Sequence, residues 1–125
     1  MIAADTSTWI AFLQGERGKD VDLLDRALGD KQIVMVPTVL TELLSDPKLD
    51  VDVAKTLETL PLAEIRDGFW FRAGVLRADV LAKKRKARLG DALIAQCCID
   101  HDIALITRDR DFSAFANSAG LRLLV

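Results

Sequence analysis

Four acidic residues, spread along a chain of 125 residues, are candidates for metal-assisted chemistry. The chain has one histidine and two cysteines, so a site built around these acids would offer oxygen ligands alone. Oxygen ligands suit hard cations such as Mg²⁺ or Mn²⁺, and a phosphodiester is the natural substrate of such a site. The four acids are Asp5, Glu42, Asp91 and Asp109.

Each acid lies where an α/β fold would deliver it to one end of the sheet. Asp5 follows the apolar start of the chain, and Asp109 follows a later apolar run at 103–107. In an open parallel sheet, ligands bind beyond the carboxyl ends of the strands. If these two strands are neighbours, Asp5 and Asp109 face each other across the crevice. Asp91, which starts an apolar helix, and Glu42, on the helix after the second strand, can reach the same place.

Ordinary explanations exist for each acid taken alone. Asp5, Asp91 and Asp109 all precede helical segments, where aspartate is a preferred N-cap. Glu42 alone would usually face solvent, although its neighbours on the helix are apolar. Several ionised carboxylates cannot share one crevice without help, because like charges repel. A bound cation would remove that conflict.

Alternating strand and helix patterns predict the elements that position these acids. The pattern predicts a three-layer α/β/α domain with a central, mostly parallel sheet of about five strands. Asp67 is expected to cap the long helix, and Gly90 to separate it from the helix that Asp91 starts. The expected strands are 2–5, 32–36, 62–65, 103–107 and 121–125. The expected helices are 7–13, 21–28, 38–44, 51–60, 68 to the basic cluster, 92–99 and 112–116.

Composition predicts one domain over residues 1–125 in the cytoplasm. Half of the residues are hydrophobic, which is enough for a sizeable core at this length. The apolar runs are broken by charges well before the ~20 residues of a membrane span, and the N-terminus reads as a strand rather than a basic leader. Cys97 and Cys98 are sequence neighbours, a poor arrangement for a disulfide, so we expect two buried, reduced thiols.

The charge of the chain is acidic on average and basic in one segment. A net charge of −2 argues against a protein that coats nucleic acid through bulk positive charge. Lys83-Lys84-Arg85-Lys86 and Arg88 nevertheless form a dense basic run just before Asp91. This run could attract phosphates locally, or it could simply complement the dipole at the end of the preceding helix.

The ordered set of motifs resembles the PIN-domain ribonucleases of the VapC toxin type, over the whole chain. The resemblance implies that Asp5, Glu42, Asp91 and Asp109 are the acidic quartet, with Thr107 as a supporting polar residue. Asp111 is a second acid that could replace Asp109 at the metal, and we favour Asp109. The matching stretches are Asp5-Thr6-Ser7 with Trp9-Ile10, Val36 to Leu43, Gly90 to Ala95, and Leu105 to Phe112 with Gly120-Leu121 beyond.

By the same resemblance, the protein is an Mg²⁺-dependent endoribonuclease in which Mn²⁺ substitutes. Asp5, Asp91 and Asp109 would hold the metal. The implied partners are an RNA substrate and a VapB-like antitoxin. A homodimer is also implied, with a heterotetramer or larger assembly formed with the antitoxin. Apolar candidates for the dimer contacts are Trp9, Phe12, Trp70 and Phe71.

Three other functions are compatible with parts of the pattern. The chain could be a PIN-fold RNA-processing nuclease outside any toxin–antitoxin system, or a non-catalytic domain that binds RNA or protein. A receiver-like or phosphatase-like phosphotransfer domain also keeps Mg²⁺ and aspartates at strand ends. That chemistry usually needs a lysine after a later strand, where this chain has Thr107-Arg108.

Overall fold

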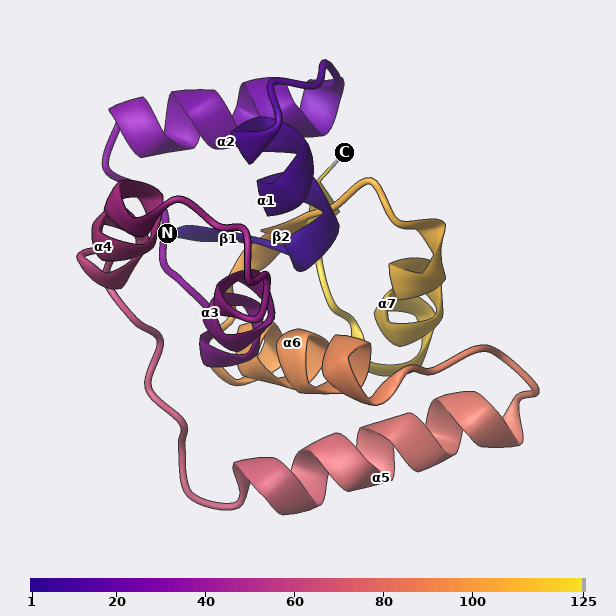
Figure 1. Ribbon diagram of the computed structural model, residues 1–125. Coiled ribbons are helices and arrows are strands. Elements are labelled where there is room, and N and C mark those ends of the chain that lie inside the picture. Colours follow the sequence, from indigo (N-terminus) through magenta and orange to yellow (C-terminus); the bar gives the residue numbers. More distant parts are fainter. Residues whose placement is uncertain (125) are drawn as a thin grey trace.

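The computed structural model describes residues 1–124, and its centre is a parallel sheet of three short strands (Figure 1). They are β1 (Ile2–Ala4), β2 (Ala104–Ile106) and β3 (Leu123–Leu124), in the order β1-β2-β3. Ile2 lies opposite Ala104, and Leu105 lies opposite Leu123. The strands before Asp5 and Asp109 are therefore neighbours, which is the condition for these two acids to lie at the same edge of the sheet.

The predicted number of about five strands is wrong, since the described residues form three. The segments expected as strands at 32–36 and 62–65 make only single parallel bridges, Ile33 to Ile2 and Met35 to Leu62. Pro37 follows immediately as the first residue of a helix, and a proline has no N–H to extend a ladder. These two segments are therefore connected to the sheet by isolated bridges and do not form regular strands.

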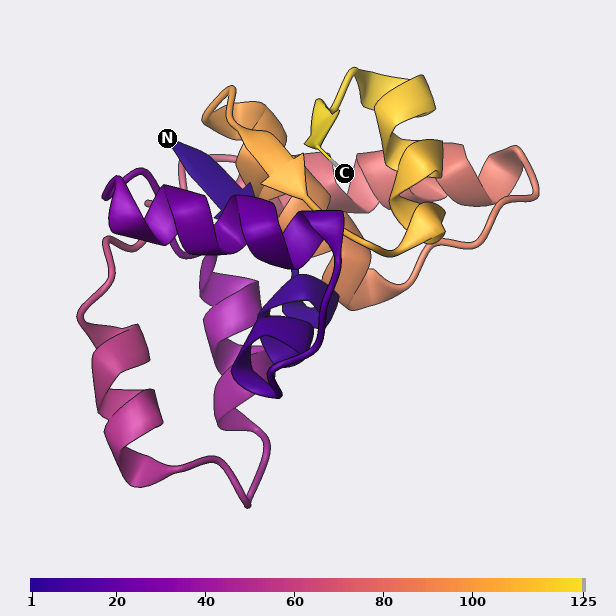
Figure 2. The same cartoon turned by 90° about the horizontal axis from the view of Figure 1, so that it is seen from above.

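Seven α-helices surround the strands within residues 1–124. Figures 1 and 2 show α2 crossing one face of the sheet, while α6 lies on the other face with α5 outside it. The α/β architecture with helices on both sides of a parallel sheet agrees with the prediction. The helices are α1 (Thr6–Leu13), α2 (Lys19–Gly29), α3 (Pro37–Leu44), α4 (Val51–Glu58), α5 (Phe69–Ala82), α6 (Leu89–Asp100) and α7 (Ser113–Ala119), with a 3₁₀ turn η1 (Arg110–Phe112).

Two helix boundaries differ from the prediction. The N-cap of α5 is Gly68, with φ of 81°, rather than Asp67. A side chain at Gly68 would be strained at that φ and would meet the Arg72 guanidinium at 2.6 Å. The helix α6 begins at Leu89, so Gly90 lies inside it, and Asp91 belongs to its first turn instead of preceding it.

The core is built around α6 and the strands. The largest side chains that are fully buried are aromatic, among them Trp9, Phe69 and Phe112. Cys97 and Cys98 are buried and free, as predicted, and burial raises the pKa of the Cys97 thiol to about 11. No helix of the described residues combines the length and apolar character needed to cross a membrane.

Candidate active site

Asp5 lies at the carboxyl end of β1 and is almost fully buried, with 3% of its surface exposed. It caps α1 by accepting the Thr8 backbone N–H at 3.0 Å. Ser7 Oγ donates to its carboxylate at 2.8 Å, and Thr107 Oγ1 does so at 2.8 Å from the end of β2. Burial raises the pKa of Asp5, and these hydrogen bonds lower it only in part, so the net pKa lies above the ordinary value.

Asp109 is joined to Asp5 through Thr107. The Asp109 backbone N–H donates to Thr107 Oγ1 at 2.9 Å, and the same hydroxyl donates to Asp5. The Asp109 carboxylate caps η1 by accepting the Asp111 N–H at 2.9 Å. The carboxylate of Asp111 instead forms an ion pair with Lys86 at 3.4 Å. Of the two acids, Asp109 is therefore tied to Asp5, and Asp111 is tied to the basic segment.

Asp91 has electrostatic surroundings that include the other three acids. Its pKa is raised to about 6, first by burial and then by the negative charge of Asp109, with further contributions from Asp5 and Glu42. The Arg88 guanidinium acts in the opposite direction. Asp5, Glu42 and Asp109, which come from three other parts of the chain, thus lie near enough to Asp91 for their charges to act on it.

Glu42 reaches the same region from α3. Its side chain is exposed and accepts a hydrogen bond from Thr6 Oγ1, at the start of α1. It also approaches the first turn of α6, because a Cβ added at Gly90 would lie 3.2 Å from Glu42 Oε2. Gly90 therefore has a steric role, in which its missing side chain lets Glu42 lie next to Asp91.

The donor set fits a hard divalent cation. None of the four carboxylates is in an ion pair with a lysine, arginine or histidine within the part of the chain that the structure describes. Their mutual repulsion at Asp91 is the condition that a divalent ion relieves. In residues 1–124, no three acidic, histidine or cysteine side chains are already gathered as a metal-ligand group, so binding would require these carboxylates to turn toward the ion.

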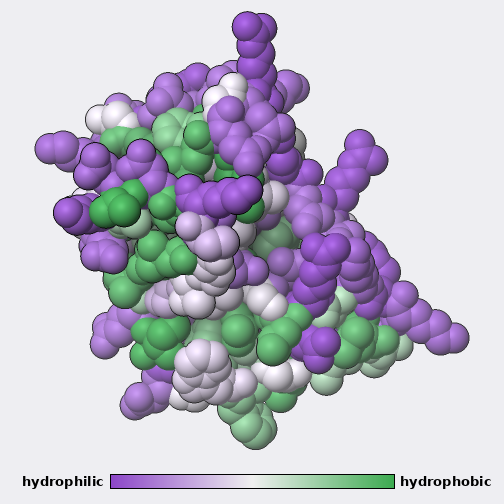
Figure 3. All heavy atoms as spheres, viewed as in Figure 1, coloured by the Kyte–Doolittle hydropathy of each residue, from purple (hydrophilic) through white to green (hydrophobic). Residues whose placement is uncertain are grey.

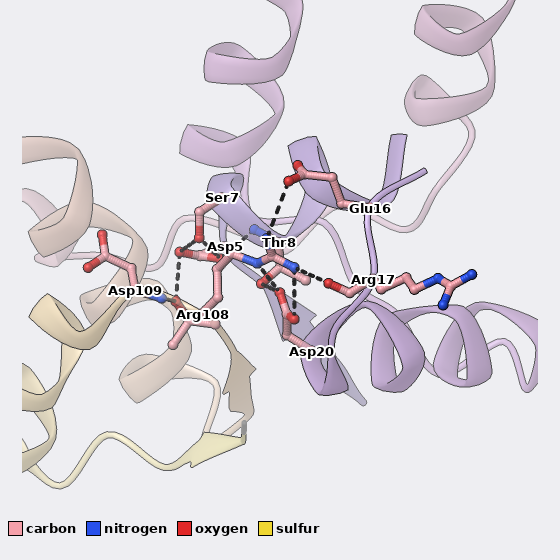
Figure 4. A network of polar contacts seen from close by, with 9 residues as sticks. Asp5, Ser7, Thr8, Glu16, Arg17, Asp20, Arg108 and Asp109 are labelled. Atoms are coloured by element: carbon pink, nitrogen blue, oxygen red, sulfur yellow. Dashed lines mark hydrogen bonds and ion pairs between the residues drawn. The ribbon is translucent and has the colours of Figure 1, made fainter. Parts of the chain in front are cut away.

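A buried network behind Asp5 was not predicted from the sequence. Asp20, at the start of α2, is 4% exposed and accepts hydrogen bonds from Thr8 Oγ1 at 3.0 Å and Arg108 Nε at 2.8 Å. Figure 4 shows the Arg108 guanidinium lying between Asp20 and Glu16. An aspartate in the first turn of a helix is ordinary, and nothing in its spacing pointed to Arg108.

The basic segment lies in the turn between α5 and α6, where Figure 3 shows hydrophilic side chains projecting. Lys83 and Arg85 donate to serines of α7, Ser118 at 3.1 Å and Ser113 at 3.2 Å. All the basic side chains of this segment are exposed. The segment lies after the end of α5 and directly before α6, which is the helix that carries Asp91.

The aromatic residues proposed for dimer contacts divide into two groups. Trp9 is 2% exposed, so the structure removes it as an interface candidate, while Phe12 is partly buried and makes an edge-on contact with Trp9. Trp70 and Phe71 of α5 are 66% and 77% exposed. Trp9 is buried because the face of α1 that carries it packs against the core, and Phe12 lies at the edge of that face.

The parallel sheet, with acidic residues at its carboxyl edge, defines an α/β protein with a candidate hydrolytic site. A family model for the PIN domain matches residues 2–118 of the chain. The protein therefore belongs to the PIN domain family.

Solved structures that share the fold include VapBC proteins, one of which is described as a member of the VapBC family of toxin–antitoxin systems. A chain of VapBC2 from Rickettsia felis, bound to a DNA fragment from their promoter, is 21% identical with a TM-score of 0.76, and the match covers 99% of this chain and 98% of that one. A chain of DNA-bound VapBC from Salmonella typhimurium is 17% identical with a TM-score of 0.73, covering 99% and 98%. A chain of VapBC-5 from Mycobacterium tuberculosis is 20% identical with a TM-score of 0.70, covering 98% and 96%. At these identities, the similarity establishes the fold.

Proposed function

We propose that this protein is a divalent-metal-dependent endoribonuclease that acts in the cytoplasm as the toxin of a type II toxin–antitoxin pair. The observation that carries the proposal is the Thr107 hydroxyl that joins Asp5 and Asp109 at the ends of two neighbouring parallel strands, and the raised pKa of Asp91 supports it. Acids gathered at the carboxyl edge of a parallel sheet are an arrangement that favours a cation and a phosphate substrate.

The roles of the residues follow from their positions. Asp5, Asp91 and Asp109 would hold Mg²⁺, or Mn²⁺ in its place. Thr107, whose hydroxyl is hydrogen-bonded to both Asp5 and Asp109, would fix the position of these two residues relative to each other. Glu42, which is longer and reaches in from α3, would orient the attacking water. When bound, the ion would lower the pKa of that water and stabilise charge on the leaving oxygen.

The basic segment supports RNA as the substrate. Its side chains precede Asp91 by a few residues and are exposed, so they can contact phosphates on either side of the scissile bond. Contacts of this kind position a strand without selecting its sequence. The exposed Trp70 and Phe71 support a homodimer interface on α5, and the VapBC structures that share the fold support a VapB-like antitoxin as partner.

The nuclease activity is tested with purified protein, RNA and Mn²⁺, with and without a chelator. We expect cleavage that the chelator stops and that Asp5→Asn abolishes. Asp25→Asn is the matched control, because Asp25 is an exposed aspartate on α2 away from the four acids. Cleavage that persists in the chelator and in Asp5→Asn would refute the mechanism. Failure to cleave any RNA would favour a non-catalytic binding domain.

The toxin role is tested separately by expression in cells. We expect growth arrest from this chain alone, no arrest from Asp5→Asn, and relief by a small protein encoded beside it. Normal growth together with metal-dependent cleavage in vitro would favour an RNA-processing nuclease outside a toxin–antitoxin system.

A further inference from the structure

Two branches leave the buried carboxylate of Asp20 (Figure 4): one is hydrogen-bonded through to Asp5, and the other reaches Asp109 through the backbone of Arg108. In the first branch, Thr8 Oγ1 donates to Asp20 Oδ2 at 3.0 Å, while the Thr8 backbone N–H donates to Asp5 Oδ1 at 3.0 Å. In the second branch, Arg108 binds Asp20 with two nitrogens, at 2.8 and 3.2 Å. Arg108 lies between Thr107 and Asp109 in the chain.

We propose that Asp20 and Arg108 are a positioning pair that fixes the spacing between Asp5 and Asp109, and thereby the affinity of the site for its divalent ion. This inference rests on the proposed function, because the ion is the group that those two acids would share. Neither Asp20 nor Arg108 is proposed to touch the metal or the RNA. Their role is to hold Thr8 on one side of Asp5 and the strand end at Thr107 on the other.

The geometry distinguishes this pair from an incidental surface contact. Asp20 has 4% of its surface exposed, and its side chain is only 6% exposed, so its charge must be matched from inside the protein. A bidentate contact between an arginine and a carboxylate fixes orientation as well as distance. Arg108 also donates to the Arg17 carbonyl at 3.1 Å, which ties the strand end to the loop before α2.

Gly18 gives independent support for a tightly packed pair. A Cβ at this position would lie 2.5 Å from Asp20 Oδ1 and 2.9 Å from Arg108 Nη2. Real Cβ atoms do not approach so closely, so a side chain here would push the pair apart. Gly18→Ala therefore crowds the pair without changing any charge at Asp20 or Arg108, although it also strains the backbone, because φ is 155° at this position.

A matched control exists at the opposite end of α6 from Asp91. Asp100 is likewise held by two nitrogens of an arginine, Arg72, at 3.1 and 2.6 Å, and by a neutral donor, Gln96 Nε2, at 2.9 Å. Its side chain is 9% exposed. Asp20→Asn and Asp100→Asn thus remove similar ion pairs, and only the first lies next to the candidate active site.

The experiment measures Mn²⁺ binding by electron paramagnetic resonance, the rate of RNA cleavage across a range of Mn²⁺ concentrations, and thermal unfolding. We expect Asp20→Asn to weaken Mn²⁺ binding by about tenfold or more, as the loss of an outer partner of a metal ligand usually does. Excess Mn²⁺ should recover part of the cleavage rate. Arg108→Lys should give a smaller loss, because lysine keeps the charge and loses the two-point contact.

Asp100→Asn should lower the melting temperature while leaving Mn²⁺ binding unchanged. Wild-type Mn²⁺ affinity in Asp20→Asn, or an equal loss in Asp100→Asn, would overturn the positioning role. If Asp20→Asn does not fold, the same criteria apply to Arg108→Lys and Gly18→Ala.

Failure of the proposed function would be visible in the wild-type protein, as neither Mn²⁺ binding nor cleavage. The positioning role is then judged by amide hydrogen exchange at Thr8 and Asp109. Faster exchange at both amides in Asp20→Asn, and not in Asp100→Asn, supports the role. Unchanged exchange refutes it.

Discussion

Replacing a proposed metal ligand should make the metal-free protein more stable. Asp91 donates and accepts no side-chain hydrogen bond in residues 1–124, so Asp91→Asn removes a charge and little else. The pKa of about 6, against an ordinary 3.8, means that the folded protein disfavours the ionised carboxylate at neutral pH. Asparagine has a similar shape and no charge, so both the cost of burying the charge and the repulsion by the other acids disappear.

The size of the effect can be worked out from that pKa. At about 1.4 kcal/mol for each tenfold change, the gap corresponds to roughly 3 kcal/mol, and solvent screening of a half-buried group reduces it to between about 1 and 2 kcal/mol. Loss of a favourable charge in the first turn of α6 takes away roughly 0.5 kcal/mol. The net gain is about 1 kcal/mol, which is a rise of about 4 °C in melting temperature for a chain of this length.

The assay is thermal unfolding in EDTA and in Mn²⁺ at pH 7.5. Asp52→Asn is the control, because Asp52 lies in the first turn of α4, is exposed, and has no acidic cluster to relieve. Asp52→Asn should be slightly less stable than the wild type, and Asp91→Asn more stable. Mn²⁺ should then stabilise the wild type more than Asp91→Asn. A melting temperature for Asp91→Asn below that of the wild type in EDTA would refute the argument.

Three further outcomes follow from the same structure. The folded-state pKa of Asp91 lies above its unfolded value, so the folded wild type binds more protons than the unfolded chain between pH 4 and 6 and loses stability as pH rises through that range. The stability advantage of Asp91→Asn in EDTA should therefore grow over the same range. An advantage independent of pH would contradict this. Gly90→Ala should lower cleavage several-fold without loss of stability, because alanine favours the helix but its Cβ crowds Glu42. Gly74→Ala on α5, with no atom within 4 Å of its added Cβ, should leave cleavage unchanged. Equal activities of the two variants would remove the steric role of Gly90. Both cysteines, buried and with raised pKa, should resist Ellman's reagent at pH 8 until the protein is unfolded, and rapid labelling of the native protein would show that the core opens there.

Much of the fold was predictable because local patterns and burial agree. The apolar runs before Asp5 and Asp109 are continuous, as in strands buried on both faces, and they do pair in parallel. The segment at 32–36 has an equally good strand pattern, and it makes one bridge on each side before Pro37 starts α3. Strand pairing depends on where the neighbouring backbone lies, and a local pattern does not contain that information.

The positions of the acids and of Thr107 could be predicted, and the Asp20–Arg108 pair behind Asp5 could not. Asp5 and Asp109 stood out because each follows an apolar run that reads as a strand, and Glu42 because a charged residue among apolar neighbours needs a reason. Asp20 carries the same chemistry as any aspartate in a first helical turn, and only the folded chain brings Arg108 to it. The prediction of Trp9 as an interface residue was wrong, because an aromatic residue on an amphipathic helix gives the same sequence pattern whether that face meets the core or a second chain.

The pairing of β1 with β2 joins the beginning of the chain to a segment near its end. A ribosome making this protein releases Asp5 first, and Thr107 and Asp109 only after about a hundred further residues have been made. Before that moment, the nascent chain holds at most part of its acidic pocket. Under the proposed toxin role, a partly made chain would therefore be inactive, and a neutralising partner would be needed only once β1 and β2 have paired.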